Sequence, residues 1–194
     1  MVIKQADDLQ EMLTRLEQQE LDCQTGSGVV PVGVYCELLA CYLANEPPML
    51  PQAKFLVGRV PGTLKQSEEG AEFNRLWAVG RAMWTRDNPG VHAALVGPWS
   101  SNVEPLMLRL ATAYKEKQIQ LVGNAYSTIK LSDLSQYVGM NETETGAMVE
   151  RVGWGWDKTS GVVSPKQSKE QRGMVPPTEE QLNRLTDFIA FLEN

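Results

Sequence analysis

The sequence predicts a mainly α-helical protein in which a helical-repeat bundle, similar in layout to TPR or HEAT repeats, is followed by a winged helix and a C-terminal tail helix. Three observations lead to this prediction. Apolar residues recur with helical spacing throughout residues 1–130. Residues 131–165 then change to two short helical segments and a hairpin pattern. A last amphipathic segment, residues 178–194, follows a polar stretch.

Each apolar stripe in residues 1–130 stops at a point where glycine or proline would end a helix. Such breaks fall at residues 26–28, 47–48 and 61–62. The stripes themselves lie in residues 9–16, 35–43, 53–60, 73–84, 103–114 and 119–129. No single helix of this kind can bury its stripe alone, so stacked helical hairpins are expected.

Several residues predict details of these helices. Gly80 lies in the middle of a stripe, where it costs about 1 kcal/mol relative to alanine, so a close approach of two helices is expected there. Asn88 is expected to be an N-cap, with Pro89 at the first helical position. Ser101 and Glu104 have the spacing of a capping box for the helix that follows.

Residues 131–165 have the layout helix, turn, helix, hairpin, which is that of a winged helix. Gly139 suits the left-handed position after the first helix. Asn141 and Glu144 form an asparagine version of the capping box for the second helix, and Gly153 ends it. Two short extended pieces around a polar turn then predict the hairpin at residues 154–165.

The end of the chain is predicted to be a flexible linker, residues 166–177, and a final helix, residues 178–194. Thr178 and Gln181 have capping-box spacing. The apolar stripe of this helix consists of Leu182, Leu185, Phe188, Ile189 and Leu192. Such a stripe must be buried either against its own domain or against a partner helix, and the sequence leaves both alternatives open.

Composition limits the partners. The formal net charge is −6 and the pI is about 4.9, which disfavours binding to nucleic acids and to anionic membranes. The most apolar run, residues 29–44, is shorter than the roughly 20 residues that a membrane span needs, and the first residues lack a signal-peptide pattern. Cys23, Cys36 and Cys41 show no metal-binding or disulfide spacing, so we expect a reduced, intracellular protein with its cysteines packed as small apolar residues.

The residues offer no recognisable catalytic site. A zinc peptidase needs several histidines or carboxylates that converge, and His92 is the only histidine. His92 lies among apolar residues of a short predicted helix, where a structural role is favoured over a general base. A phosphate-binding Gly-x-x-x-x-Gly-Lys-Ser/Thr loop is absent. We therefore expect no enzyme activity, no cofactor and no bound metal.

The winged helix raises DNA binding as an alternative function. A recognition helix usually presents basic or amide side chains to the major groove. The second helix here carries Glu142, Glu144 and Glu150 against one basic residue, Arg151, so nearby phosphates would repel it. A modest basic stretch at the wing and linker is more typical of a solvated segment.

Four groups of residues resemble a known family: Ala53 to Pro61, Trp77 to Asp87, Ala125 to Trp154, and Gln181 to Asn194. They are similar to the eighth and smallest subunit family of the COP-nine (COP9) signalosome, within the PCI group shared with the proteasome lid and the initiation factor. The third group is typical of PCI proteins in general, whereas the last is specific to this subunit. Val57-Gly58 departs from the Trp-Lys that the family often has there.

The resemblance implies a non-catalytic structural subunit of the nucleus and cytoplasm, in a complex that removes the ubiquitin-like protein NEDD from cullin-RING ligases. It implies that the winged helix joins other signalosome subunits edge to edge through its hairpin, at Trp154, Trp156, Val162 and Val163, and that the tail helix joins a bundle. Cullin-RING ligases would be indirect partners. The alternative within the group is a small subunit of the proteasome lid or of initiation factor three.

Overall fold

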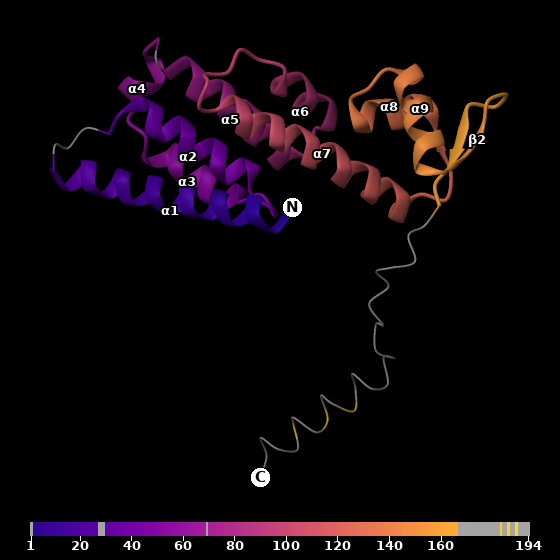
Figure 1. Ribbon diagram of the computed structural model, residues 1–194, viewed down its shortest axis with the longest axis horizontal. Helices are drawn as coiled ribbons and strands as arrows, with labels where there is room; N and C mark the ends of the chain where they lie inside the picture. The colour runs from indigo at the N-terminus through magenta and orange to yellow at the C-terminus, as the bar shows by residue number, and fades with distance from the viewer. Residues whose placement is uncertain are drawn as a thin grey trace.

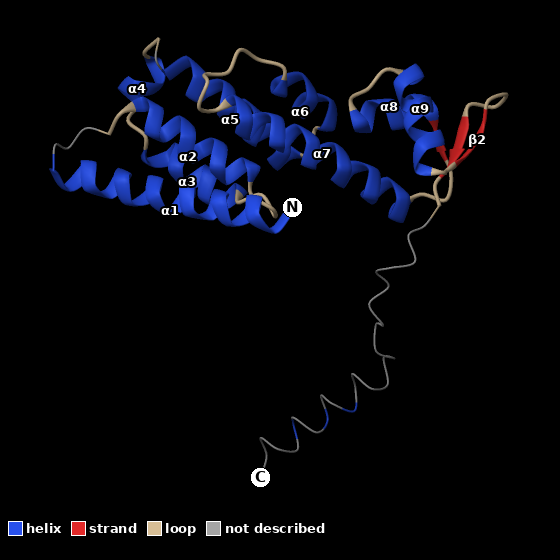
Figure 2. Ribbon diagram, in the orientation of Figure 1, coloured by secondary structure: helices blue, strands red, loops and turns tan. Residues whose placement is uncertain are grey.

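The computed structural model describes residues 2–26, 30–68 and 70–166, together with Asn183, Thr186 and Ile189. Its helices are α1 (Val2–Gly26), α2 (Val32–Ala44), α3 (Leu50–Arg59), α4 (Gly62–Gln66), α5 (Gly70–Thr85), α6 (Asn88–Leu95), α7 (Glu104–Ala125), α8 (Leu131–Val138) and α9 (Glu142–Val152). The strands are β1 (Ile129–Lys130), β2 (Gly155–Asp157) and β3 (Val162–Ser164). The prediction of a mainly helical chain with a winged helix is therefore confirmed (Figure 2).

Helix α2 is the centre of the first hydrophobic core. It packs against α1, α3, α5 and α7, and its position among them can be followed in Figure 1. Leu38, Leu39 and Leu43 on this helix have no exposed surface. A helix that is apolar on all sides is stable only when other helices surround it, so the composition of α2 sets the architecture of the bundle.

Gly80 allows α5 to approach α2 closely, as its position in the stripe predicts. A Cβ atom at Gly80 would lie 3.2 Å from Cδ2 of Leu43, closer than side chains normally pack. Glycine lowers the intrinsic stability of α5, but it allows the two helices to come into contact.

Two of the three cysteines are buried on α2, as predicted. Burial raises the pKa of the Cys36 and Cys41 thiols to about 12, with the nearby carboxylates adding to the effect. Cys23 on α1 is only half-buried. The two thiols of α2 therefore act as small apolar groups.

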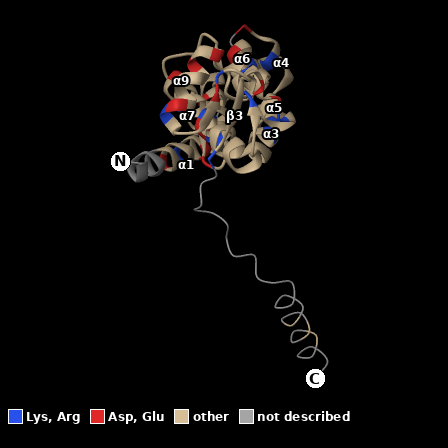
Figure 3. Cartoon of the chain, turned by 90° about the vertical axis from the view of Figure 1, so that its right-hand side faces the viewer, with Lys and Arg blue, Asp and Glu red and all other residues tan. Residues whose placement is uncertain are grey.

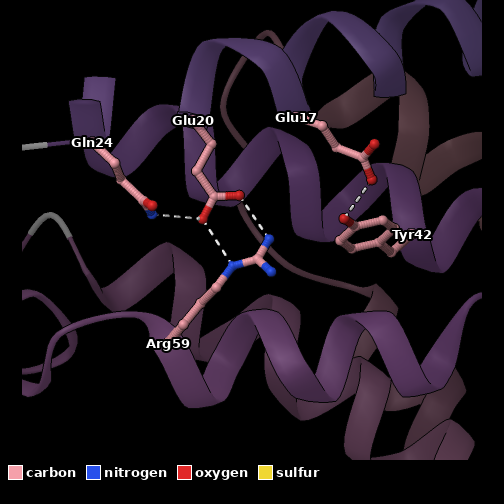
Figure 4. Close-up of polar contacts among 5 residues, drawn as sticks. All are labelled: Glu17, Glu20, Gln24, Tyr42 and Arg59. Atoms are coloured by element: carbon pink, nitrogen blue, oxygen red, sulfur yellow. Dashed lines mark hydrogen bonds and ion pairs between the residues drawn. The ribbon is translucent and has the colours of Figure 1, made fainter. Parts of the chain in front are cut away.

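A polar cluster fastens α1 to the rest of the bundle (Figure 4). Glu20 is only 5% exposed, and its two carboxylate oxygens accept hydrogen bonds from Nε and Nη2 of Arg59 at 2.8 and 2.6 Å. Glu17 accepts a hydrogen bond from the Tyr42 hydroxyl at 2.7 Å. Burial, together with this bond, raises the pKa of Tyr42 to about 12. The cluster thus links α1 to both α2 and α3.

The winged helix has its own hydrophobic core. Leu134, Val138, Val149 and Val163 in this second core have no exposed surface, and Val122 of α7 packs with them. The strand order is β1-β3-β2 with antiparallel pairs, so β3 is central. Ile129 lies opposite Val163 across the β1–β3 pair.

The predicted division of residues 103–129 into two helices is wrong. Helix α7 is continuous from Glu104 to Ala125, because residues 115–118 are good helix formers with no glycine or proline among them. Ile129 belongs to β1 and not to a helix. In addition, Gly62 begins the short helix α4, where the sequence predicted only a break.

The predicted helix caps are only partly correct. Asp87, and not Asn88, caps α6, and its Oδ1 accepts a hydrogen bond from Gly90 N at 3.1 Å. Val103 is the N-cap of α7 and makes no side-chain cap, so the Ser101–Glu104 box does not form. Asn141 occupies the N-cap of α9 as predicted, but its side chain makes no capping bond. The predicted box of Thr178 and Gln181, like the linker, lies outside the described residues.

Replacing Arg59 by methionine is expected to lower the free energy of unfolding by about 2 kcal/mol, because the buried Glu20 carboxylate would lose both charged donors. Chemical denaturation measures this change. The control is Arg81→Met, which removes an exposed arginine that forms no ion pair among the described residues, and it should change stability by less than about 0.5 kcal/mol. Equal losses in the two variants would contradict the role of the cluster.

Candidate protein interface

Strand β2 lies at an edge of the sheet. It pairs with β3 on one side, and no strand of the described part of the chain pairs with its other side. An open edge of this kind can accept a strand from another protein through main-chain hydrogen bonds. The geometry therefore provides the type of surface that the sequence predicts for the hairpin.

The turn of the hairpin is built around Asp157. Its carboxylate accepts hydrogen bonds from Thr159 N at 2.9 Å and from Ser160 Oγ at 2.6 Å, and these bonds hold its pKa below the usual value. Gly161 closes the turn with a φ of 66°, a conformation that favours glycine. The wing is thus a defined hairpin with a locally satisfied turn.

Two of the four hairpin residues predicted for the interface are core residues. Trp154 is 8% exposed and Val163 is fully buried, because both side chains pack in the second hydrophobic core. Their side chains therefore pack inside the winged helix, and their place at an interface stays a prediction. The backbone of Val163 is also paired within the chain, opposite Ile129 on one side and Trp156 on the other.

Trp156 is half-buried and packs against Gly146 of α9. A Cβ atom at Gly146 would lie only 2.7 Å from Cη2 of Trp156, so glycine is required for the indole to fit. The indole Nε1 is buried and has no hydrogen-bond partner among the described residues. Nζ of Lys158 lies 4.9 Å from the centre of the Trp156 ring and 3.0 Å from Glu150. Trp156 therefore fixes the angle of the edge strand relative to α9.

The remaining predicted interface residues have different positions. Val162 is half-buried on β3, opposite Lys130 of β1. Ile189 is helical and 55% exposed, which agrees with an apolar side chain that is open to contact. Four predicted residues lie outside the described part of the chain: Leu182, Leu185, Phe188 and Leu192.

His92 forms the joint between the bundle and the winged helix. Its Nε2 lies 3.0 Å from the backbone oxygen of Tyr137, which can only accept, so the neutral ring carries its proton on Nε2. Its ring also meets Tyr114 edge to face, at 5.5 Å between ring centres. On the other side, a Cβ at Gly139 would lie 2.2 Å from Cγ of His92. The structural role predicted for His92 thus has a specific geometry.

Burial lowers the pKa of His92, although the hydrogen bond to Tyr137 opposes this effect. Lys115 on α7 also favours the neutral ring. Burial and Lys115 therefore favour the uncharged imidazole at the joint.

Surface charge does not favour the DNA-binding alternative. The helix that would enter the major groove, α9, exposes Glu142, Glu144 and Glu150. These are the acidic residues that are expected, from the sequence, to repel phosphates. In the view of Figure 3, acidic and basic residues of the described chain are interspersed.

Among the described residues, no group of His, Cys, Asp or Glu side chains could hold a metal ion. No described helix is both long enough and apolar enough to cross a bilayer.

Sequence reasoning missed several residues that shape this region. Ile129 and Lys130 supply the third strand, and their only signal is the extended preference of residues 126–129. Gly146 is essential for Trp156, but a glycine within a helix does not reveal what it contacts. The contact between His92 and Tyr137 joins residues 45 positions apart, so spacing alone cannot find it.

The comparisons with known proteins agree with this geometry. A model of the CSN8/PSMD8/EIF3K family matches residues 32–174. The chain is 34% identical over 186 residues to COP9 signalosome complex subunit 8 from Xenopus laevis, covering 95% of this chain and 92% of the relative. It is 32% identical to the subunit of the same name from Danio rerio over 95% of this chain and 94% of the relative. It is also 32% identical to the subunit of the same name from Arabidopsis thaliana, over 73% of this chain and 71% of the relative.

The mainly helical fold, with a bundle and a winged helix that share α7, is that of a PCI-type helical protein, the class that the resemblance of the sequence implies. Within this class, the chain belongs to the CSN8/PSMD8/EIF3K family.

Gly139→Ala is expected to weaken the joint more than Gly153→Ala weakens α9. Both glycines have positive φ, 68° and 75°, so each substitution should cost about 1 kcal/mol in backbone strain. Only at Gly139 does the new Cβ also collide with His92, whereas the space around Gly153 is open. Thermal unfolding of the two variants measures the difference. Equal losses would show that the packing on His92 contributes nothing.

Stability is expected to fall as pH decreases from about 6.5, the pKa of an unfolded histidine. Because the folded state lowers the pKa of His92, the unfolded state takes up the proton first, and stability is lost as pH falls toward the folded pKa. His92→Gln should flatten this dependence between pH 7 and 5.5, where the chain has no other histidine to titrate. Melting temperatures across this range provide the measurement, and identical slopes in both proteins would refute the assignment.

Proposed function

We propose that this protein is a non-catalytic structural subunit of the COP9 signalosome. The observation that carries the proposal is the match along nearly the whole chain to relatives named as subunit 8 of that complex. The resemblance of the sequence implies that the assembled complex removes the ubiquitin-like protein NEDD from cullin-RING ligases. These ligases are therefore proposed as indirect partners of this subunit. The nucleus and the cytoplasm are the proposed location, which the same resemblance supports.

The chain is proposed to divide into a helical-repeat segment (1–130), a winged helix (131–165), a linker (166–177) and a bundle helix (178–194). The two hydrophobic cores support the first boundary approximately. Strand β1 moves it slightly, because Ile129 and Lys130 pair with β3 and so belong with the winged helix.

Two surfaces are proposed to join this subunit to its neighbours. The first is the outer edge of β2, which offers backbone groups for an added strand. The second is the apolar stripe of the final helix, of which Ile189 is the described member and is exposed. Trp154, Trp156 and Val163 are proposed to support the edge from beneath, since their side chains pack within the winged helix.

A structural role is supported by how the chain uses its single histidine. His92 bonds to the backbone of Tyr137 and packs on Tyr114 and Gly139, so its ring is committed to the joint. Within the family, membership of the proteasome lid or of initiation factor three is less favoured, because the curated relatives described above are all signalosome subunits.

Deletion of residues 178–194 is expected to leave a folded helical chain that no longer enters a large complex. Gel filtration of lysates that contain the tagged variant tests this expectation. Co-elution of the deleted chain with the complex would refute the role of the tail.

Within the tail, Leu185→Asp should reduce recovery of sister subunits at least tenfold in a pull-down, because a charge would enter an apolar interface. The matched control is Asn183→Asp, which adds the same charge at an exposed position of the same segment and should leave recovery unchanged. Equal recovery with the two variants would contradict the proposed interface.

A further inference from the structure

A polar cleft lies where the helical bundle meets the winged helix. Its volume is about 400 Å³, and it lies between the α5–α6 turn, the end of α7, β1 and α8. The side chains that matter for its chemistry are Arg86, Asp87, Tyr126, Asp133, Gln136 and Tyr137. No residue of β2 lines the cleft, so it is distinct from the outer edge of that strand.

Arg86 adopts an unusual backbone conformation at the mouth of this cleft. Its φ is 58°, and it is the one non-glycine residue with positive φ in the described chain. It follows the last residue of α5, and Asp87 N donates a hydrogen bond to Ala82 O at 3.0 Å to close the helix. Glycine is usual at this position because it adopts the conformation without strain. The arginine side chain therefore occupies a position where the backbone alone would favour glycine.

The cleft contains hydrogen-bond donors that the fold does not use. The guanidinium of Arg86 and the amide of Gln136 form no hydrogen bond or ion pair with any described residue, and both residues are exposed. The hydroxyls of Tyr126 and Tyr137 lie 3.2 Å apart. Since only one of them donates in that contact, the other hydroxyl keeps a free O–H.

The two carboxylates of the cleft have structural functions. Asp87 caps α6 by accepting a hydrogen bond from Gly90 N. Asp133 lies in the first turn of α8, where the helix dipole favours a negative charge. The hydrogen-bond donors that remain without a structural function are therefore those of Arg86, Gln136 and one of the two tyrosines, and Arg86 is a cation.

These observations together define the ligand. A planar guanidinium with free N–H groups matches a carboxylate in a two-bond arrangement. A phosphate group is less suitable, because Asp87 and Asp133 repel its two negative charges more strongly than the single charge of a carboxylate. We propose that the cleft binds a single acidic side chain, Asp or Glu, from an extended segment of a partner protein. Arg86 binds the carboxylate, and Gln136 and the tyrosine pair supply neutral donors beside it.

The walls of the cleft are held in place before any partner binds. Behind Tyr137, its backbone oxygen accepts the bond from His92. On the opposite wall, Oδ1 of Asn88 accepts a 2.5 Å hydrogen bond from the Tyr114 hydroxyl. A site whose geometry is fixed in advance loses less conformational entropy on binding.

The test uses the full chain and a random-peptide library displayed on phage. Peptides retained by the wild-type chain but not by Arg86→Gln are sequenced, and their dissociation constants are measured by calorimetry. We expect these peptides to share an acidic residue, and replacing that residue by its amide should weaken binding at least tenfold. Arg81→Gln, which removes an exposed arginine of α5, the helix that Arg86 follows, should bind the peptides as tightly as wild type.

Arg86→Gly separates binding from stability. Because glycine relieves the strained backbone, this variant should melt at the wild-type temperature or above it and still lose the acidic peptides. Three outcomes would overturn the proposal: no peptide that depends on Arg86, dependent peptides enriched in lysine or arginine, or tighter binding when phosphoserine replaces the acidic residue. A lower melting temperature for Arg86→Gly would assign Arg86 a structural role instead.

Discussion

One continuous helix, α7, ties the two halves of this molecule together. Near its start, Leu106, Met107 and Leu110 are buried in the core of the bundle, and near its end Val122 is buried in the core of the winged helix. Because a helix of 22 residues is stiff, a change at one end cannot be absorbed by a loop. The winged helix is therefore attached to the same element that closes the bundle, as Figure 1 shows.

The α6–α8 contact adds the second fixed point that a single helix cannot give. Helix α7 alone would allow the winged helix to rotate about the helix end, but His92 on α6 is bonded to Tyr137 and packed on Gly139 of the same unit. Two points of attachment define an orientation. The open edge of β2 and the polar cleft are consequently held at a set position relative to the bundle, which is useful in a subunit that must present several surfaces together.

The sequence predicts the helices, the hairpin and the close contact at Gly80, because each leaves a local signal: an apolar period, a turn or a costly glycine. It fails for contacts between distant residues. The pairing of β1 with β3 joins Ile129 to Val163, and only the sheet makes that short segment a strand. In the sequence, an apolar residue of the hairpin has the same pattern whether its side chain faces the core or the surface. Only the structure shows that the side chains of Trp154 and Val163 face the core.

The burial of these side chains has a consequence for how the winged helix recognises a neighbour. At β2, Trp156 packs inward on Gly146, while Gly155 contributes no side chain, so the edge offers mainly backbone groups. Backbone groups are the same in every strand and give affinity without selectivity. Side chains outside the sheet are therefore better suited to selecting a partner, and the unpaired donors of Arg86 and the exposed Ile189 are two of them.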